Sequence, residues 1–93
     1  MAWACIHTIE GGHLEEYDKV NAEIGDVGRP EGLIVHVACP IEDGFRLIDV
    51  WDSREQYERF RDEHVIPAMT RVFGGEPSAP SVFEPMEVHR IVP

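Results

Sequence analysis

The first quarter of the chain changes from a two-residue hydrophobic period to a helical one. Over residues 2–9 the side chains at odd and even positions point to opposite faces of an extended strand, and Gly11 and Gly12 interrupt it. From His13 onward, apolar residues recur at helical spacing, at Leu14, Tyr17, Val20 and Ile24. The pattern therefore predicts a strand over residues 2–9 and a helix that ends at Gly25.

Two further strands and a second helix follow. The strands are predicted over residues 32–38 and 45–51, and the sequence IEDG between them is typical of a hairpin turn. Ser53 is a good helix N-cap, and Gln56 three positions later completes a capping-box pattern. One face of the helix that begins there carries Tyr57, Phe60 and His64.

Prolines punctuate the last part of the chain. Pro67 is expected to end or kink the second helix, with a short continuation over residues 68–73. The sequence GGEPSAPS is typical of a loop, and residues 82–92 are predicted to form the last strand, interrupted by Pro85.

The resulting order is β-α-β-β-α-β within a single domain, residues 1–93. Two helices would then cover one face of a four-stranded antiparallel sheet, which is the α+β, ferredoxin-like arrangement. Right-handed crossovers place the strands, numbered along the chain, in the order 4-1-3-2.

The uncovered face of this sheet predicts self-association. It would carry either Trp3, Cys5 and Ile9 or Ala4 and Ile6, and neither set suits contact with water. Pairing with the sheet of a second copy would bury these side chains. We therefore expect a homodimer that forms through the sheet face.

Composition narrows the classes of partner. Eighteen acidic and eight basic residues give a formal charge of −10, which argues against nucleic acid and against anionic membrane surfaces. Two cysteines without a metal-binding or disulfide spacing favour a reducing cytoplasm. The N-terminal residues do not have the pattern of a signal peptide, and no apolar run approaches the length of a membrane span.

Four segments resemble one protein superfamily: EGGHLEEYDKVNAEIG, EGLIVHVACP, FRLIDVWDSREQYERFRDEHVIPAM and FEPMEVHRIV. They are similar to the dimeric α/β-barrel superfamily, and specifically to its small bacterial members near the antibiotic biosynthesis monooxygenase type. The resemblance implies a pocket between sheet and helices in each subunit, and two sheets that close back to back into a barrel. It leaves the activity open, because the superfamily includes cofactor-free oxygenases, polyketide cyclases, haem-degrading enzymes, isomerases and members with no known reaction.

Two branches of this superfamily can be compared residue by residue. The haem-degrading members have a tryptophan where this chain has Phe60, a histidine near Thr70 and an asparagine near Cys5, so the resemblance disfavours haem oxygenation. A cyclase branch has a histidine after a Pro-Ala pair, whereas Met69 follows that pair here. No bound organic cofactor is therefore expected.

Histidines are the first candidates for chemistry. His7, His36 and His89 each lie within a different predicted strand, and a strand-borne imidazole could take a proton from a phenol or an activated methylene. The alternative is that each is a core or interface histidine. A metal site is disfavoured, because the strand order puts His7 and His89 on adjacent strands, roughly 5 Å apart, but His36 about 10 Å from His7.

Asp49 is the second candidate. It shares a strand face with Leu47 and Trp51. If that face is the one that the helices cover, its carboxylate could orient a histidine or accept a substrate proton. The alternative is a structural ion pair with one of the arginines Arg46, Arg54 and Arg90, or a bond to a side chain of the first helix.

Aromatic side chains would shape the pocket. Trp51 and Phe60 would contact a bound molecule, and Tyr17 and Tyr57 could each donate a hydrogen bond to a developing oxyanion. The alternative for all four is ordinary core packing.

These residues support two classes of function. The first is a small cofactor-free enzyme of the monooxygenase or cyclase type that acts on an aromatic or polyketide-like molecule. In it, His7 or His36 is the base, Asp49 orients the base, and Trp51, Tyr17, Tyr57, Phe60 and His89 contact the substrate. The second class is a ligand-binding or stress-related dimer without turnover, whose pocket is filled by its own side chains and whose Asp49 is neutralised by an arginine.

Overall fold

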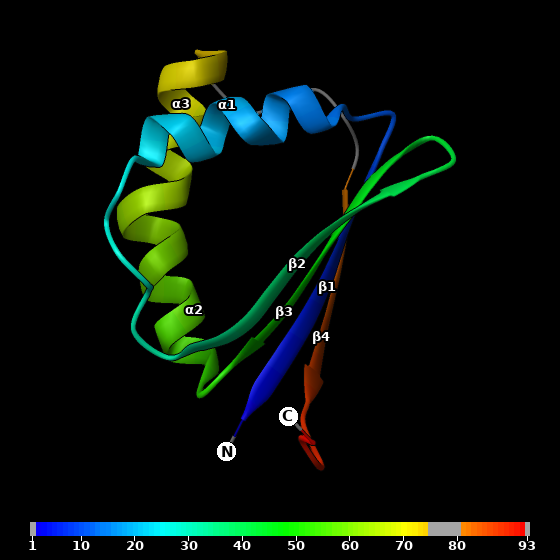
Figure 1. The fold of residues 1–93 in the computed structure, drawn as a ribbon, viewed down its shortest axis with the longest axis vertical. Coiled ribbons are helices and arrows are strands. Elements are labelled where there is room, and N and C mark those ends of the chain that lie inside the picture. Colours follow the sequence, from blue (N-terminus) through cyan, green and yellow to red (C-terminus); the bar gives the residue numbers. More distant parts are fainter. Residues whose placement is uncertain (1, 75–80, 93) are drawn as a thin grey trace.

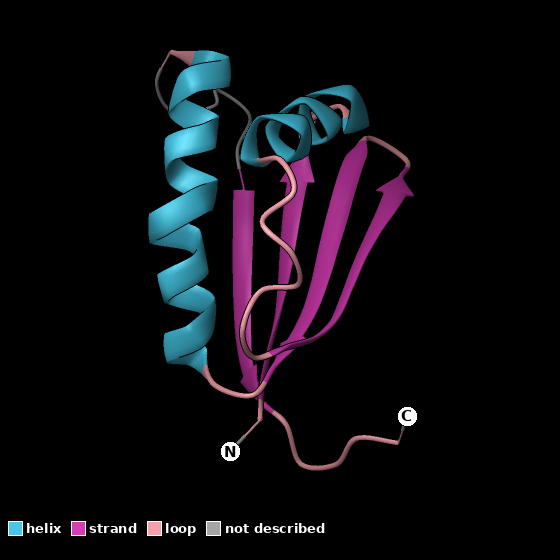
Figure 2. Ribbon diagram, turned by 60° about the vertical axis from the view of Figure 1, so that its left-hand side comes forward, coloured by secondary structure: helices cyan, strands magenta, loops and turns pink. Residues whose placement is uncertain are grey.

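An antiparallel sheet carries the fold, and the helices lie on only one of its faces (Figures 1 and 2). The computed structural model describes residues 2–74 and 81–92. Its elements follow the predicted order and confirm the ferredoxin-like fold: β1 (Trp3–Glu10), α1 (Leu14–Ile24), β2 (Leu33–Ile41), β3 (Gly44–Trp51), α2 (Arg54–Phe60), η1 (Arg61–Val65), α3 (Ile66–Phe73) and β4 (Ser81–Glu87).

The four strands lie in the order β2-β3-β1-β4, which confirms the predicted topology. β2 and β4 are therefore the edges of this sheet. Pro40 lies in β2 and Pro85 in β4. An interior strand forms backbone hydrogen bonds on both of its sides, and proline has no N–H to donate. Proline is therefore tolerated in an edge strand, which is paired on one side only.

The β2–β3 hairpin is tighter than the sequence pattern suggested. Ile41 pairs with Gly44, so that only residues 42 and 43 form the turn, and β2 runs past Pro40. Gly44 has φ of 131°, and a Cβ there would lie 2.1 Å from the carbonyl oxygen of Ile9 on β1. The close approach of β1 therefore requires glycine at this position.

The second helix continues through Pro67 without a break (Figure 1). It begins as predicted, because the Ser53 side chain accepts a hydrogen bond from the Gln56 backbone N–H. Just before the proline, the chain winds as a π-helix, η1, and Pro67 falls in the first turn of α3. Proline cannot donate to the preceding turn and its ring crowds the carbonyl there, so a wider turn accommodates it inside a continuous helix.

The prediction of a last strand over residues 82–92 is wrong at its C-terminal end. β4 ends at Glu87, which pairs with Trp3, the first residue of β1. The Val88 N–H still donates to the Ala2 carbonyl, but residues 88–92 form no strand. His89 therefore lies outside the sheet, and the expectation that it sits beside His7 on an adjacent strand is also wrong.

The two faces of the sheet differ in their cover. On the helix side, Trp3, Cys5 and Trp51 form the buried core. Partly buried apolar side chains pack around it: Leu33, Tyr57, Phe60 and Phe83. Strand alternation puts another apolar set on the opposite face, and four of its members are 40% to 51% exposed: Val35, Val37, Val82 and Met86. No helix in the described part of the chain is long and apolar enough to cross a membrane.

Gly44→Ala should destabilise the protein by at least about 2 kcal/mol, because the new methyl group strains the backbone and overlaps the Ile9 carbonyl. Gly11→Ala is the matched control: it has φ of 73° but open space around the Cβ position. It should cost only about 1 kcal/mol. Urea unfolding of the three proteins measures both values, and equal losses would contradict the close approach of β1.

Candidate active site

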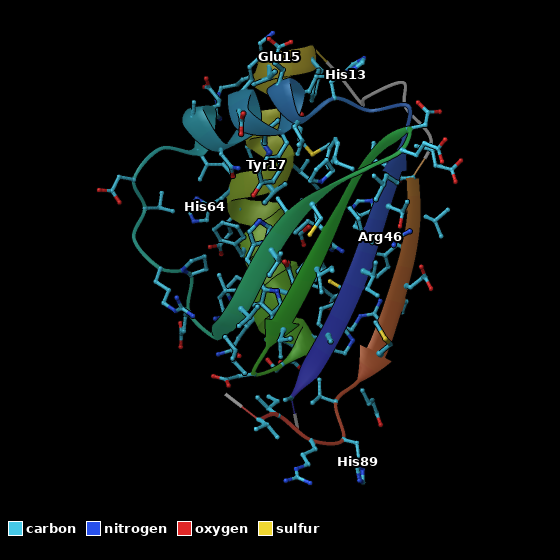
Figure 3. The ribbon with its side chains drawn as sticks, turned by 45° about the vertical axis from the view of Figure 1, so that its right-hand side comes forward. His13, Glu15, Tyr17, Arg46, His64 and His89 are labelled. Atoms are coloured by element: carbon cyan, nitrogen blue, oxygen red, sulfur yellow. The ribbon has the colours of Figure 1, made fainter. Side chains whose placement is uncertain are left out.

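Three polar side chains from three elements form one hydrogen-bonded chain. The Tyr17 hydroxyl on α1 lies 2.5 Å from Nε2 of His36 on β2. Nδ1 of the same imidazole lies 2.5 Å from Oδ1 of Asp49 on β3. Figure 3 shows Tyr17 beneath α1, between this helix and the sheet. The structure therefore brings together three of the residues that the sequence analysis singled out, each from a different segment.

The register of the β2–β3 hairpin creates the pair at the centre of this chain. His36 is the cross-strand partner of Asp49, so both side chains stand on the same face of the sheet. On the other side of β3, Asp49 is opposite Cys5, a member of the buried core. The face that Asp49 occupies is therefore the helix-covered one.

Asp49 is 8% exposed and has no arginine partner among the described residues. Its Oδ1 meets His36, and its Oδ2 accepts a hydrogen bond from the Trp51 indole N–H at 3.2 Å. Arg46 instead donates to Thr8, its pairing partner on β1, on the opposite face of the sheet. Asp49 therefore bonds to a histidine, as its predicted orienting role requires, and not to an arginine.

The proton positions follow from the donor inventory. An ionised Asp49 only accepts, so Nδ1 of His36 carries the proton between them. Nε2 of the neutral imidazole is then free to accept a hydrogen bond from the Tyr17 hydroxyl. The arrangement is that of a hydroxyl, a base and an orienting carboxylate, which can move a proton from the hydroxyl end toward the imidazole.

The hydrogen-bonded chain is buried at its Asp49 end and accessible at its Tyr17–His36 end. Trp51 is 2% exposed and Asp49 nearly as buried, whereas the His36 side chain is 34% exposed. Tyr17 is half-buried, and its ring stacks on the His36 imidazole at 5.9 Å. A molecule from solvent can therefore reach the Tyr17–His36 end, while the charge of Asp49 stays sheltered.

His7, the other base proposed from the sequence, lies outside the chain. It is half-buried on β1, and its ring meets the Phe83 ring edge-on at 5.8 Å. Burial lowers the pKa of His7, while the nearby charge of Asp49 acts in the opposite direction. The position of His7 beside the core therefore disfavours its charged form.

The remaining predicted contact residues lie elsewhere. Tyr57 packs against Trp3 at 5.0 Å, and burial raises its pKa to about 12. Phe60 packs against Trp51 at 6.0 Å and against His64 at 5.3 Å. His89 is exposed beyond β4, at the end of the molecule away from Tyr17 (Figure 3).

Two open pockets lie at the surface of the described structure. One, of about 180 Å³, lies between the α1–β2 loop and the second helix, and Arg29, Phe60 and His64 are among its walls. The other, of about 470 Å³, lies where β1 and β4 meet the start of α2, beside Trp3 and Arg54. Neither is lined by His36 or Asp49, and no group of His, Cys, Asp and Glu in the described ranges could hold a metal ion.

The lowered pKa of His7 predicts a pH-dependent loss of stability. Below its ordinary value of 6.5 the unfolded chain binds this proton more readily than the folded protein does. Stability therefore rises with pH through that region and is lost as pH falls. His7→Gln should lose less free energy of unfolding than the wild type between about pH 7.5 and about pH 5.

Urea unfolding at both pH values measures this difference, and the other groups titrate alike in the two proteins. His13→Gln, at an exposed position before α1, is the control and should lose as much as the wild type. Parallel losses in His7→Gln and wild type would contradict the burial of an uncharged imidazole.

Comparisons with solved structures support the fold, whereas two other comparisons found no match. No protein-family model matches the chain, and a search of curated proteins gave no match. Among solved structures, SnoaB from Streptomyces nogalater, a cofactor-independent oxygenase, is 15% identical with a TM-score of 0.63, over 99% of this chain and 96% of that one. The heme-degrader MhuD from Mycobacterium tuberculosis, with two hemes in its active site, is 19% identical with a TM-score of 0.62, over 98% and 99%.

A third structure, a Caulobacter crescentus protein named for antibiotic biosynthesis monooxygenases, is 12% identical with a TM-score of 0.72, over 96% of this chain and 91% of that one. Similarity at these identities establishes the architecture and not the reaction. The chain thus shares the ferredoxin-like fold of these three structures.

Proposed function

We propose that the protein is a small enzyme that removes a proton from an aromatic or polyketide-like molecule, without a bound organic cofactor. The observation that carries this proposal is the Tyr17–His36–Asp49 chain, with an accessible hydroxyl at one end and a buried carboxylate at the other. The similarity in fold to SnoaB, a cofactor-independent oxygenase, supports the reaction class.

The proton follows the hydrogen bonds. A phenol or activated methylene lies against the Tyr17 oxygen, which accepts its proton as the Tyr17 hydroxyl proton moves to Nε2 of His36. Asp49, bonded to Nδ1, stabilises the resulting imidazolium. The Trp51 N–H holds the second carboxylate oxygen and so keeps Oδ1 directed at His36.

Two reactions are open to the deprotonated substrate. A phenolate is electron-rich enough to pass electrons to dioxygen; insertion of one oxygen atom then yields a quinone, and the other atom leaves as water. A deprotonated methylene can instead attack a carbonyl in the same molecule and close a ring by aldol addition. Haem degradation of the MhuD kind is not proposed, because Phe60, Thr70 and Cys5 stand at or near the positions where the haem-degrading members have a tryptophan, a histidine and an asparagine.

His36→Gln and Asp49→Asn should each reduce turnover by about 100-fold, since each interrupts general-base catalysis while the side-chain size is nearly kept. Tyr17→Phe should reduce it comparably, because the ring remains but the proton has no path to His36. Oxygen uptake and product formation over a panel of phenols and polyketide-like diketones measure these rates.

His13→Gln is the control histidine variant, because His13 is exposed and its side chain makes no capping bond at the start of α1. It should retain wild-type rates. Wild-type rates in His36→Gln would remove this residue as the base, and His7→Gln would then test the other histidine on the helix-covered face.

A second candidate function is ligand binding without turnover. It is favoured by the aromatic cluster, because Trp3, Trp51, Tyr57 and Phe83 fill much of the space between the sheet and α2. Under this proposal an aromatic compound would change the fluorescence of Trp3 and Trp51 without being consumed, in wild type and in His36→Gln alike. Saturable binding together with turnover that depends on His36 would instead favour the enzyme.

We further propose that the active unit is a homodimer joined through the uncovered sheet face. Exposed Val35 and Val37 on β2 and Val82 and Met86 on β4 flank the central strands on this face. Burial of this surface against a second copy would remove an unfavourable contact with water.

Val37→Glu should convert the proposed dimer to a monomer, because the pairing of two copies would bury one or both added charges. Val27→Glu is the matched control, since Val27 is equally apolar and exposed but lies in the α1–β2 loop. Sedimentation equilibrium gives the mass of each protein. A monomeric wild type, or dissociation by both variants alike, would contradict the sheet-face dimer.

A further inference from the structure

The hydrogen-bonded chain has a second chemical capability, because its hydroxyl is also a nucleophile. The Tyr17 oxygen contacts Nε2 of His36, and Nδ1 of His36 contacts Asp49. This is the arrangement of a nucleophile, a base and a carboxylate in a catalytic triad. Both distances are 2.5 Å, within the reach that such a set requires. The indole of Trp51 orients the carboxylate from its other side.

We propose that Tyr17 accepts an acyl group from activated aryl esters, with His36 as the base and Asp49 as the carboxylate that orients it. This acyl-transfer activity needs neither dioxygen nor an acidic substrate. It therefore goes beyond the proposed removal of a substrate proton and does not rest on it.

The step balances without an oxidant or reductant. The Tyr17 oxygen attacks the ester carbonyl carbon as its proton moves to Nε2 of His36; the bond from that carbon to the aryl oxygen then breaks. The aryl oxide takes the proton from His36 and leaves as a phenol. Water subsequently attacks the acyl-tyrosine, passes a proton through His36 back to the Tyr17 oxygen, and releases a carboxylic acid.

The two tyrosines of the chain differ in the features that this reaction needs. Tyr17 is half-buried beside an accessible imidazole. Tyr57 stacks within the aromatic cluster, and burial raises its pKa to about 12, so its phenol keeps its proton. Tyr57 is therefore an internal control for Tyr17 as the nucleophile.

Reaction of the whole protein with p-nitrophenyl acetate near neutral pH tests the proposal. Acid quenching during the first turnover and peptide mass spectrometry locate the acetyl group, while the release of p-nitrophenolate gives the rate. We expect acetyl on Tyr17 and little or none on Tyr57. Absence of acetyl from Tyr17, or equal labelling of the two tyrosines, would overturn the proposal.

Variants separate base catalysis from mere exposure. His36→Gln should slow acetylation of Tyr17 by about 100-fold, and Asp49→Asn should slow it less, whereas His13→Gln should leave the rate unchanged. An undiminished rate in His36→Gln would show an exposed phenol and no catalytic set, which contradicts the proposal. Circular dichroism checks that each variant is folded. If His36→Gln does not fold, Asp49→Asn decides the question, and an acetylation rate equal to that of the wild type would overturn the proposal.

The two proposals can fail separately. Oxygen uptake that depends on Tyr17 without its acetylation would support proton removal and overturn acyl transfer. Acetylation of Tyr17 with no turnover of phenols or diketones would support acyl transfer alone.

Discussion

The burial of the Asp49 carboxylate is the constraint on which the candidate site depends. A charge placed beside Trp51 and Cys5 costs several kcal/mol unless it is paired and fully hydrogen-bonded. His36 and the Trp51 indole supply those partners, one to each oxygen. No buried side-chain nitrogen or oxygen of the described residues lacks a hydrogen-bond partner, so the polar chain is compatible with the apolar core around it.

This constraint connects the sheet, the core and the chemistry. The pairing of β2 with β3 places His36 opposite Asp49, while the packing of Trp51 sets the position of its N–H. Because β2 is an edge strand, the imidazole stays accessible although its partner is buried. α1 then supplies the hydroxyl. The same geometry supports proton transfer and nucleophilic attack, since both require a hydroxyl against a base that a carboxylate orients.

The sequence pattern predicted the elements well where one local cause dominates. Ser53 caps the second helix because its hydroxyl can satisfy an otherwise free backbone N–H, and this needs no distant partner. Pro67 also acts locally: it lies in the first turn of α3, the predicted continuation of the helix, directly after a π-helix. One local interpretation failed for a physical reason. The last strand ends at Glu87, opposite Trp3, the first residue of β1, and this leaves His89 outside the sheet.

The sequence by itself determined the β-α-β-β-α-β order, the strand topology and the candidate residues Tyr17, His36 and Asp49, since hydrophobic period and residue chemistry are local properties. Only the tertiary structure decided which of them meet. A strand pattern leaves the register open by one residue, and such a shift sends every side chain to the other face. The two-residue turn at residues 42 and 43, beside the close approach of β1 to Gly44, sets the register in which His36 rather than an arginine hydrogen-bonds to Asp49.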